Sequence, residues 1–194
     1  MPVQHFLSPA RKIPACLEAF REAGEVLLIF PLYTDCMPGI VKEFLERIYL
    51  ELPRGGKKIG FMVQSGFREG IHSAAIERYL NRFAFRMGYE SPGTLIKGGV
   101  EGIQIMPPLM TRTLFRDFRI LGSYYAQKGE FEKKIFEKFR KPWRLSAMSR
   151  LMFRIISLTG MTHFYWNMNL KKNGAFDKKD DRPFLPATED QMNL

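Results

Sequence analysis

The sequence predicts an α/β fold in which a parallel sheet carries helices on both of its faces. Short apolar runs bounded by glycine or proline, such as residues 26–30 (VLLIF) and 57–64 (KKIGFMVQ), are typical of strands buried on both sides. Stretches with a helical apolar stripe separate these runs, and such an alternation indicates βαβ units. The chain has 194 residues, of which 45% are hydrophobic, so it can bury a sizeable core.

The elements of this sheet are expected within residues 1–111. Strands are predicted at residues 3–7, 26–30, 57–64 and 94–97. Helices are predicted at residues 14–24, 40–52 and 73–87, each with an apolar stripe at helical spacing. Pro14 suits a first helical turn, Gly24 ends the first helix, and Gly88 suits a left-handed cap after the third.

Two loops leave the carboxyl ends of neighbouring strands, where ligands bind in sheets of this kind. The first, residues 31–39 (PLYTDCMPG), offers an aromatic face and polar groups that suit a planar heteroaromatic ligand. In the second, residues 65–70 (SGFREG), glycines allow close backbone approach and Arg68 can reach an anion. For the first loop the alternative is a plain turn in which Asp35 caps the next helix. For the second loop it is an ordinary strand-to-helix connection without a ligand.

These segments resemble a known family. The stretch VLLIFPLYTDCMPGIVKEFLERI is similar to the third strand, flavin loop and following helix of flavodoxin-like NAD(P)H-dependent FMN reductases. KKIGFMVQSGFREGIHSAAIERYL is similar to the next strand, second flavin loop and helix of that family, and YWNMNLKKNGAFDKKDDRPF to a C-terminal tail of one branch. The resemblance covers roughly residues 3–184 and implies a flavodoxin-like sheet.

The resemblance also implies a site and a reaction. It places the isoalloxazine edge of FMN against Pro31, Leu32, Tyr33, Thr34 and Asp35, mostly through backbone groups. It places the other wall of the site at Ser65, Gly66, Phe67, Glu69 and Gly70. The implied activity is that of an oxidoreductase that moves hydride from NAD(P)H to FMN and on to a small-molecule acceptor. Since the flavin carries this chemistry, no catalytic side chain is expected.

The sequence departs from the family at its start. The family has five strands in the order 2-1-3-4-5, and the first strand, its phosphate loop and the first helix have no counterpart here. Three explanations stay open: a start codon upstream, a degenerate member without tight flavin binding, or oligomerisation that completes the sheet. The alternative function is therefore a flavin-free structural module, or one that binds an anionic membrane surface.

The charge is uneven along the chain. Residues 1–111 hold 13 Lys+Arg and 11 Asp+Glu, whereas residues 112–182 hold 17 and 7. We therefore predict an α/β domain over residues 1–111, a basic helical extension over residues 112–182, and a tail over residues 183–194. Helices are expected near residues 110–125, 130–140 and 143–158.

The basic extension permits three interpretations. Packing on the α/β domain or on a partner subunit ranks first, since apolar stripes usually pack. Contact with anionic lipid ranks second and nucleic-acid binding third, so no nucleic-acid partner is expected. A homo-oligomer, such as a dimer, is expected.

Other classes are disfavoured by composition. Cys16 and Cys36 are too few for a disulfide scaffold or an iron–sulfur cluster, and His5, His72 and His163 lack metal-ligand spacing. No signal peptide or membrane span is apparent, so a cytoplasmic location is expected.

Overall fold

The computed structural model describes residues 3–158 and 163–181. Contacts divide the chain into two compact units, Met1–Leu145 and Ser146–Leu194. The first unit holds the sheet and five α-helices, and the second holds two α-helices among its described residues. No helix in the described part of the chain is long and apolar enough to cross a membrane.

The first unit alternates helices and strands in chain order. Its elements are α1 (Ile13–Glu22), β1 (Glu25–Pro31), α2 (Gly39–Glu51), β2 (Lys58–Gln64), α3 (Ala74–Met87), β3 (Thr94–Lys97), α4 (Pro108–Lys128) and α5 (Lys133–Phe139). The three strands form one parallel sheet in the order β1-β2-β3, with Leu28 opposite Phe61 and Phe61 opposite Thr94. This is the order of the third, fourth and fifth strands in a 2-1-3-4-5 sheet.

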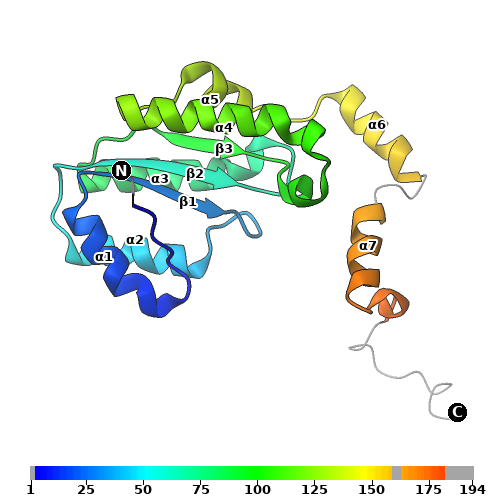
Figure 1. Cartoon of the computed structure of the whole chain (residues 1–194), viewed down its shortest axis with the longest axis horizontal. Coiled ribbons are helices and arrows are strands. Elements are labelled where there is room, and N and C mark those ends of the chain that lie inside the picture. The colour runs from blue at the N-terminus through cyan, green and yellow to red at the C-terminus, as the bar shows by residue number, and fades with distance from the viewer. Residues whose placement is uncertain (1–2, 159–162, 182–194) are drawn as a thin grey trace, which may run out of the picture. The chain divides into compact units, whose positions relative to one another are not determined.

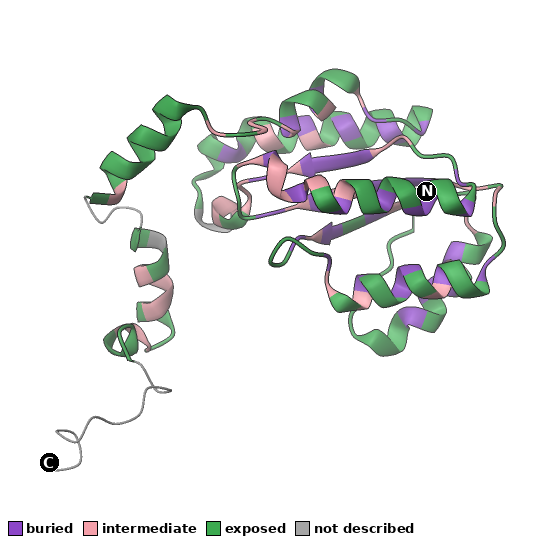
Figure 2. Cartoon of the chain, turned by 180° about the vertical axis from the view of Figure 1, so that it is seen from behind, coloured by how far each residue is buried: buried purple, intermediate pink, exposed green. Residues whose placement is uncertain are grey.

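Helices cover both faces of the sheet (Figure 1). On one face, apolar residues of α1, α2 and α3 pack on alternate residues of β1 and β2, including Leu28 and Phe61. On the other face, α4 and α5 pack on Leu95 of β3, with Leu27 and Met62 at its margin. Figure 2 shows this burial as stripes on the inward sides of the helices. The predicted class, an α/β fold with a parallel sheet, is confirmed.

The prediction of a strand over residues 3–7 is wrong. This segment has no ladder partner, and Val3 and Phe6 are exposed. The sheet of the described residues consists of β1, β2 and β3, and residues 3–7 join neither of its edges. An extended apolar segment without a neighbouring strand cannot satisfy a ladder, so local β-propensity is not sufficient.

The unit boundary and the change in charge do not coincide. Charge changes near residue 112, in the first turns of α4, whereas the contacts divide the chain between Leu145 and Ser146. Both α4 and α5 therefore belong to the unit that contains the sheet. The second unit contains α6 (Ala147–Leu158) and α7 (Phe164–Lys172), and the predicted tail over residues 183–194 lies outside the described residues.

A buried carboxylate joins α4 to α5. The Asp117 side chain is only 6% exposed; Lys138 of α5 donates a hydrogen bond to it, and Arg116 lies 3.4 Å away. The hydrogen bond from Lys138 holds the pKa of Asp117 below its ordinary value. Its stabilising contribution is therefore complete above the ordinary pKa of aspartate and is lost as pH falls through the lowered value.

We expect Asp117→Asn to lower the free energy of unfolding by about 1–2 kcal/mol at pH 7, because a charge-assisted hydrogen bond is lost. The deficit should shrink at acid pH, where the native carboxyl is itself protonated. Urea unfolding at neutral and acid pH measures this difference in the free energy of unfolding. Asp180→Asn, which changes an exposed carboxylate, is the control. An equal deficit at both pH values would contradict this role.

Candidate functional site

The loop after β1 ends in a tight two-residue turn. Tyr33 N–H donates to the Cys36 carbonyl at 2.8 Å, and Cys36 N–H donates back to Tyr33 at 3.0 Å. Thr34 and Asp35 both have positive φ, 49° and 61°, which defines a type I′ turn. Asp35 does not cap the following helix, because the N-cap of α2 is Pro38. The turn leaves Tyr33 65% exposed beyond the end of β1.

Leu32 fixes the base of this turn. Its N–H donates to the carbonyl of Gln64, the last residue of β2, at 2.7 Å, and its side chain is buried. Pro31 is the last residue of β1 and lies opposite Gln64 in the ladder. Of the five residues predicted in this loop, Pro31 and Leu32 therefore support the turn, and Tyr33, Thr34 and Asp35 form its exposed part.

The loop after β2 is held by its buried serine. Ser65 N–H donates to the carbonyl of Lys97 in β3 at 3.1 Å, and its hydroxyl donates to the Phe67 carbonyl at 3.2 Å. These bonds leave the Phe67 ring half exposed, stacked on His72 with the ring centroids 4.3 Å apart. Gly66 is exposed beside Glu101, whose carboxylate lies 2.8 Å from the position of an added Cβ.

His72 joins the two loops. Its Nδ1 lies 3.5 Å from Oδ1 of Asp35, and its Nε2 lies 3.7 Å from Oε2 of Glu69. The sequence predicts no site role for His72, because the histidines lack metal-ligand spacing. The structure brings three predicted residues, Asp35, Phe67 and Glu69, around this imidazole.

A later segment of the same unit covers the far end of the second loop. Gly70 N–H donates to the Pro142 carbonyl at 2.9 Å, and Leu145 N–H donates to Oε1 of Glu69 at 2.6 Å. A Cβ on Gly70 would lie 2.8 Å from the Arg140 carbonyl, so glycine is required for this close approach. Glu69 and Gly70 are thus bound by the chain itself, and the exposed part of the candidate site lies at Tyr33–Asp35 and Phe67, beside the half-buried His72.

Two cations lie at the same edge of the sheet. Lys97 ends β3 and is half-buried, and its ammonium donates to the Gly98 carbonyl. Burial lowers the pKa of Lys97, and the neighbouring guanidinium of Arg68 lowers it further. An anion bound here would offset both effects. The sequence pointed to Arg68 but not to Lys97, although the end of a strand in a parallel sheet is a signal for it.

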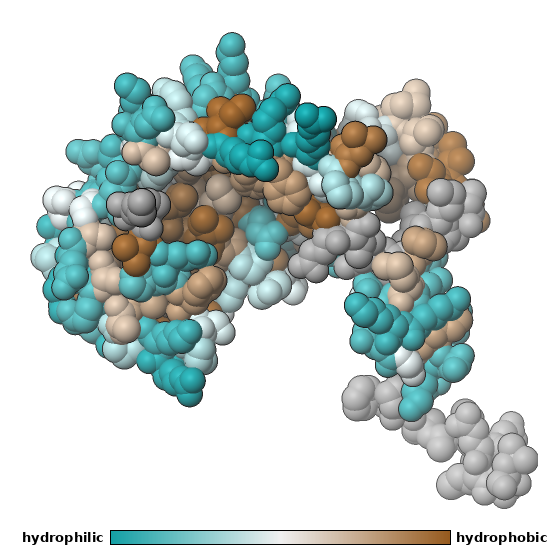
Figure 3. All heavy atoms as spheres, viewed as in Figure 1, coloured by the Kyte–Doolittle hydropathy of each residue, from teal (hydrophilic) through white to brown (hydrophobic). Residues whose placement is uncertain are grey.

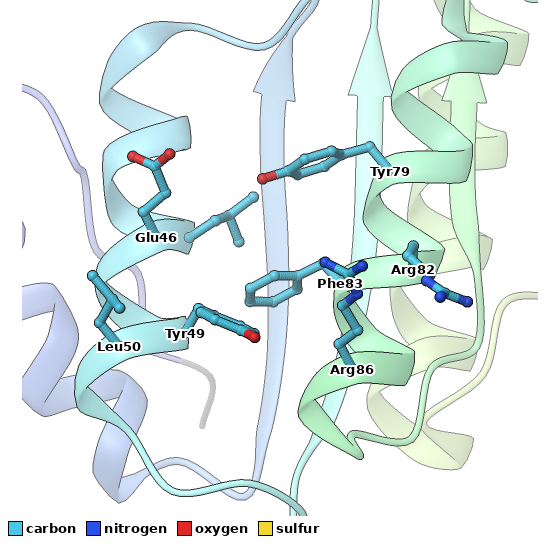
Figure 4. Close-up of a pocket in the computed structure, with 8 residues that line it drawn as sticks. Glu46, Tyr49, Leu50, Tyr79, Arg82, Phe83 and Arg86 are labelled. Atoms are coloured by element: carbon cyan, nitrogen blue, oxygen red, sulfur yellow. The ribbon is translucent and has the colours of Figure 1, made fainter.

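A separate cavity of about 490 Å³ lies between α2 and α3, away from these loops (Figure 4). Tyr49, Tyr79 and Phe83 form its aromatic walls, and Arg82 and Arg86 border it. None of the residues predicted for the flavin site lines this cavity. Among the described residues, no cluster of three or more His, Cys, Asp or Glu side chains could hold a metal ion.

No protein-family model and no curated protein matches the chain. Among solved structures, it is similar to the Trp repressor binding protein from Bacillus subtilis, with 17% identity and a TM-score of 0.41 over 46% of this chain and 64% of that one. It is also similar to the apo form of an NADH:FMN oxidoreductase, with 18% identity and a TM-score of 0.40 over 74% and 66% of the two chains. The chain spans about two thirds of the length of these two relatives.

Proposed function

We propose that this α/β protein is an FMN-dependent oxidoreductase that accepts hydride from NAD(P)H and passes electrons to a small-molecule acceptor. The observation that carries the proposal is the convergence of the β1 and β2 loops on His72, where the two exposed rings of Tyr33 and Phe67 occur at the carboxyl edge of the sheet. The sequence resemblance independently points to the same two loops.

The residues present suit the two parts of such a ligand. Exposed aromatic rings offer flat apolar surface to a planar ring system, and the turn at Thr34–Asp35 offers main-chain polar groups at its rim. The cations Arg68 and Lys97 suit the phosphates of FMN or of a nicotinamide dinucleotide. The exposed rings, the polar turn and the two cations together match the ring system and the phosphate of FMN.

Bound FMN would supply the hydride-accepting chemistry, and the chain's residues would position and tune it. Tyr33 and Phe67 orient the ring system and exclude water from its faces. His72, between the carboxylates of Asp35 and Glu69, would hold the two loops together at this edge. Arg68 and Lys97 attract an anionic reductant to the same edge.

FMN titration of the full chain, followed by quenching of flavin fluorescence, tests the proposal. We expect saturable binding, and FMN-dependent oxidation of NAD(P)H by the loaded protein. Tyr33→Ala and Phe67→Ala should each weaken FMN binding by roughly tenfold, since one aromatic stacking contact contributes about 1–3 kcal/mol. Tyr79→Ala, which removes a comparably exposed ring from the α2–α3 cavity, is the matched control. Absence of binding, or equal losses in all three variants, would favour the flavin-free alternative.

Lys97→Met tests separately what the Lys97 charge does to the stability of the fold and to the binding of NADPH. Because the fold lowers the pKa of Lys97, the unfolded chain binds the proton more tightly, and stability rises as pH increases through the lowered pKa. Removing the charge should therefore keep or raise Tm at neutral pH and flatten its rise at alkaline pH. It should also raise the KM for NADPH several-fold. A lower Tm with unchanged KM would refute both parts.

A further inference from the structure

The helix α6 in the second unit has an apolar stripe that no part of the described chain buries. None of its 12 residues is buried, and Met148, Leu151, Met152 and Ile155 are each at least half exposed. Leu151, Met152 and Ile155 follow Met148 by three, four and seven residues, and this spacing places all four on one side of the helix. Figure 2 shows the helix as exposed almost throughout, and Figure 3 shows apolar side chains gathered on it.

The other side of α6 is basic and polar. Arg150 and Arg154 are four residues apart and so share a face, with Ser157 one turn further on. The hydroxyl of Ser146 accepts the N–H of Ser149 at 3.1 Å, which satisfies a free donor in the first turn of the helix. Residues 138–176 contain eight Lys and Arg and no Asp or Glu, so no acidic residue of this stretch neutralises the arginines.

We propose that α6 docks in the plane of an anionic phospholipid surface. At about 1.5 Å per residue the helix is roughly 18 Å long, too short to cross a bilayer but long enough to lie in its interface. The apolar stripe enters the acyl boundary while Arg150 and Arg154 meet phosphate headgroups. In the same unit, Phe164 and Trp166 of α7 are exposed aromatic residues of the kind that favours this depth.

Lipid accounts for both faces of the helix together. A nucleic acid would pair with the arginines but leave the apolar stripe in water. An apolar protein surface would cover the stripe but give the arginines no anion. An anionic bilayer offers a hydrocarbon boundary to the apolar stripe and a layer of phosphates to the arginines.

Flotation of the full chain with lipid vesicles tests the proposal. We expect the chain to float with phosphatidylcholine vesicles that contain about 30 mol% phosphatidylglycerol, and to stay unbound with phosphatidylcholine alone. Raising the salt from about 0.05 M to about 0.5 M should weaken binding by tenfold or more, since screening shortens the electrostatic range. Failure to float on anionic vesicles at low salt overturns the proposal.

Two pairs of variants locate the effect. Arg150→Ser with Arg154→Ser should weaken vesicle binding by roughly tenfold, whereas Arg112→Ser with Arg119→Ser removes the same charge from α4 and should change it less than twofold. Leu151→Asp should abolish binding, and Leu109→Asp, which changes a still more exposed leucine on α4, should not.

Circular dichroism and light scattering check that the variants keep the fold and the oligomeric state of the parent chain. All four variants should keep the native spectrum and oligomeric state, because none of the replaced side chains is buried. Equal losses in the α4 and α6 variants would overturn the assignment to α6. So would a change of oligomeric state in Leu151→Asp without vesicle binding by the parent chain, which would identify the stripe as a protein interface. These outcomes are independent of whether FMN binds.

Discussion

Gly98→Ala is expected to lower the free energy of unfolding by about 1–3 kcal/mol and to weaken FMN binding more than tenfold. A Cβ at this position would lie 2.4 Å from the carbonyl oxygen of Phe67 and 3.0 Å from that of Arg68. Both are main-chain atoms, so the loop after β2 must move to relieve the overlap. Since Phe67 carries one of the two exposed rings of the proposed site, the displacement should be felt in binding as well as in stability.

Gly122→Ala is the matched control. Gly122 lies inside α4, and apart from the adjacent residues and the helix's own backbone, no heavy atom is within 4 Å of the position of an added Cβ. Alanine there should stabilise the fold by about 0.5–1 kcal/mol, because glycine is a poor helix former. Thermal unfolding and FMN titration of both variants give the comparison. If Gly98→Ala is as stable as the parent and binds FMN normally, the described packing of the β2 loop is incorrect.

Arg140→Ala is the second change with a large expected effect. The guanidinium of Arg140 binds both carboxylate oxygens of Glu77 on α3, at 2.7 and 2.8 Å, and stacks on Trp143 with 4.7 Å between guanidinium carbon and ring centroid. The Glu77 side chain is only 14% exposed, so removal of its partner leaves a poorly solvated charge. We expect a loss of about 2–4 kcal/mol in the free energy of unfolding.

The same change should uncover the loop after β2. Arg140 begins the segment whose backbone binds Glu69 and Gly70, so its release should speed amide exchange at residues 69–71. Arg140→Met combined with Glu77→Gln should recover part of the stability, because the unpaired charge is gone. Arg47→Ala, which breaks a more exposed pair with Glu51, should cost less than about 1 kcal/mol. Equal costs for Arg140→Ala and Arg47→Ala would contradict the account.

The sequence predicted the strands best where an apolar run is bounded by glycine or proline. Residues 94–97 form β3 with the predicted bounds, and Gly88 adopts the left-handed cap after α3, with φ of 64°. The prediction failed at residues 3–7, where the pattern suits a strand but the segment pairs with no strand of the described sheet. Strand formation depends on a partner that local sequence cannot supply.

The candidate site was predictable in outline only. The positions of the two loops follow from the rule for the carboxyl edges of parallel sheets. The bridging position of His72 and the covering segment that binds Glu69 do not, because they join residues 37 and 76 positions apart in the chain. Such contacts depend on tertiary packing, which no motif or periodicity encodes.

Hydrogen–deuterium exchange of the full chain with and without FMN tests the central claim most directly. If the loops after β1 and β2 bind the flavin, FMN should slow amide exchange in residues 31–36 and 65–72 and leave residues 45–50 and 79–86, which border the α2–α3 cavity, unchanged. Protection confined to the cavity residues, or no protection anywhere at saturating FMN, would contradict it.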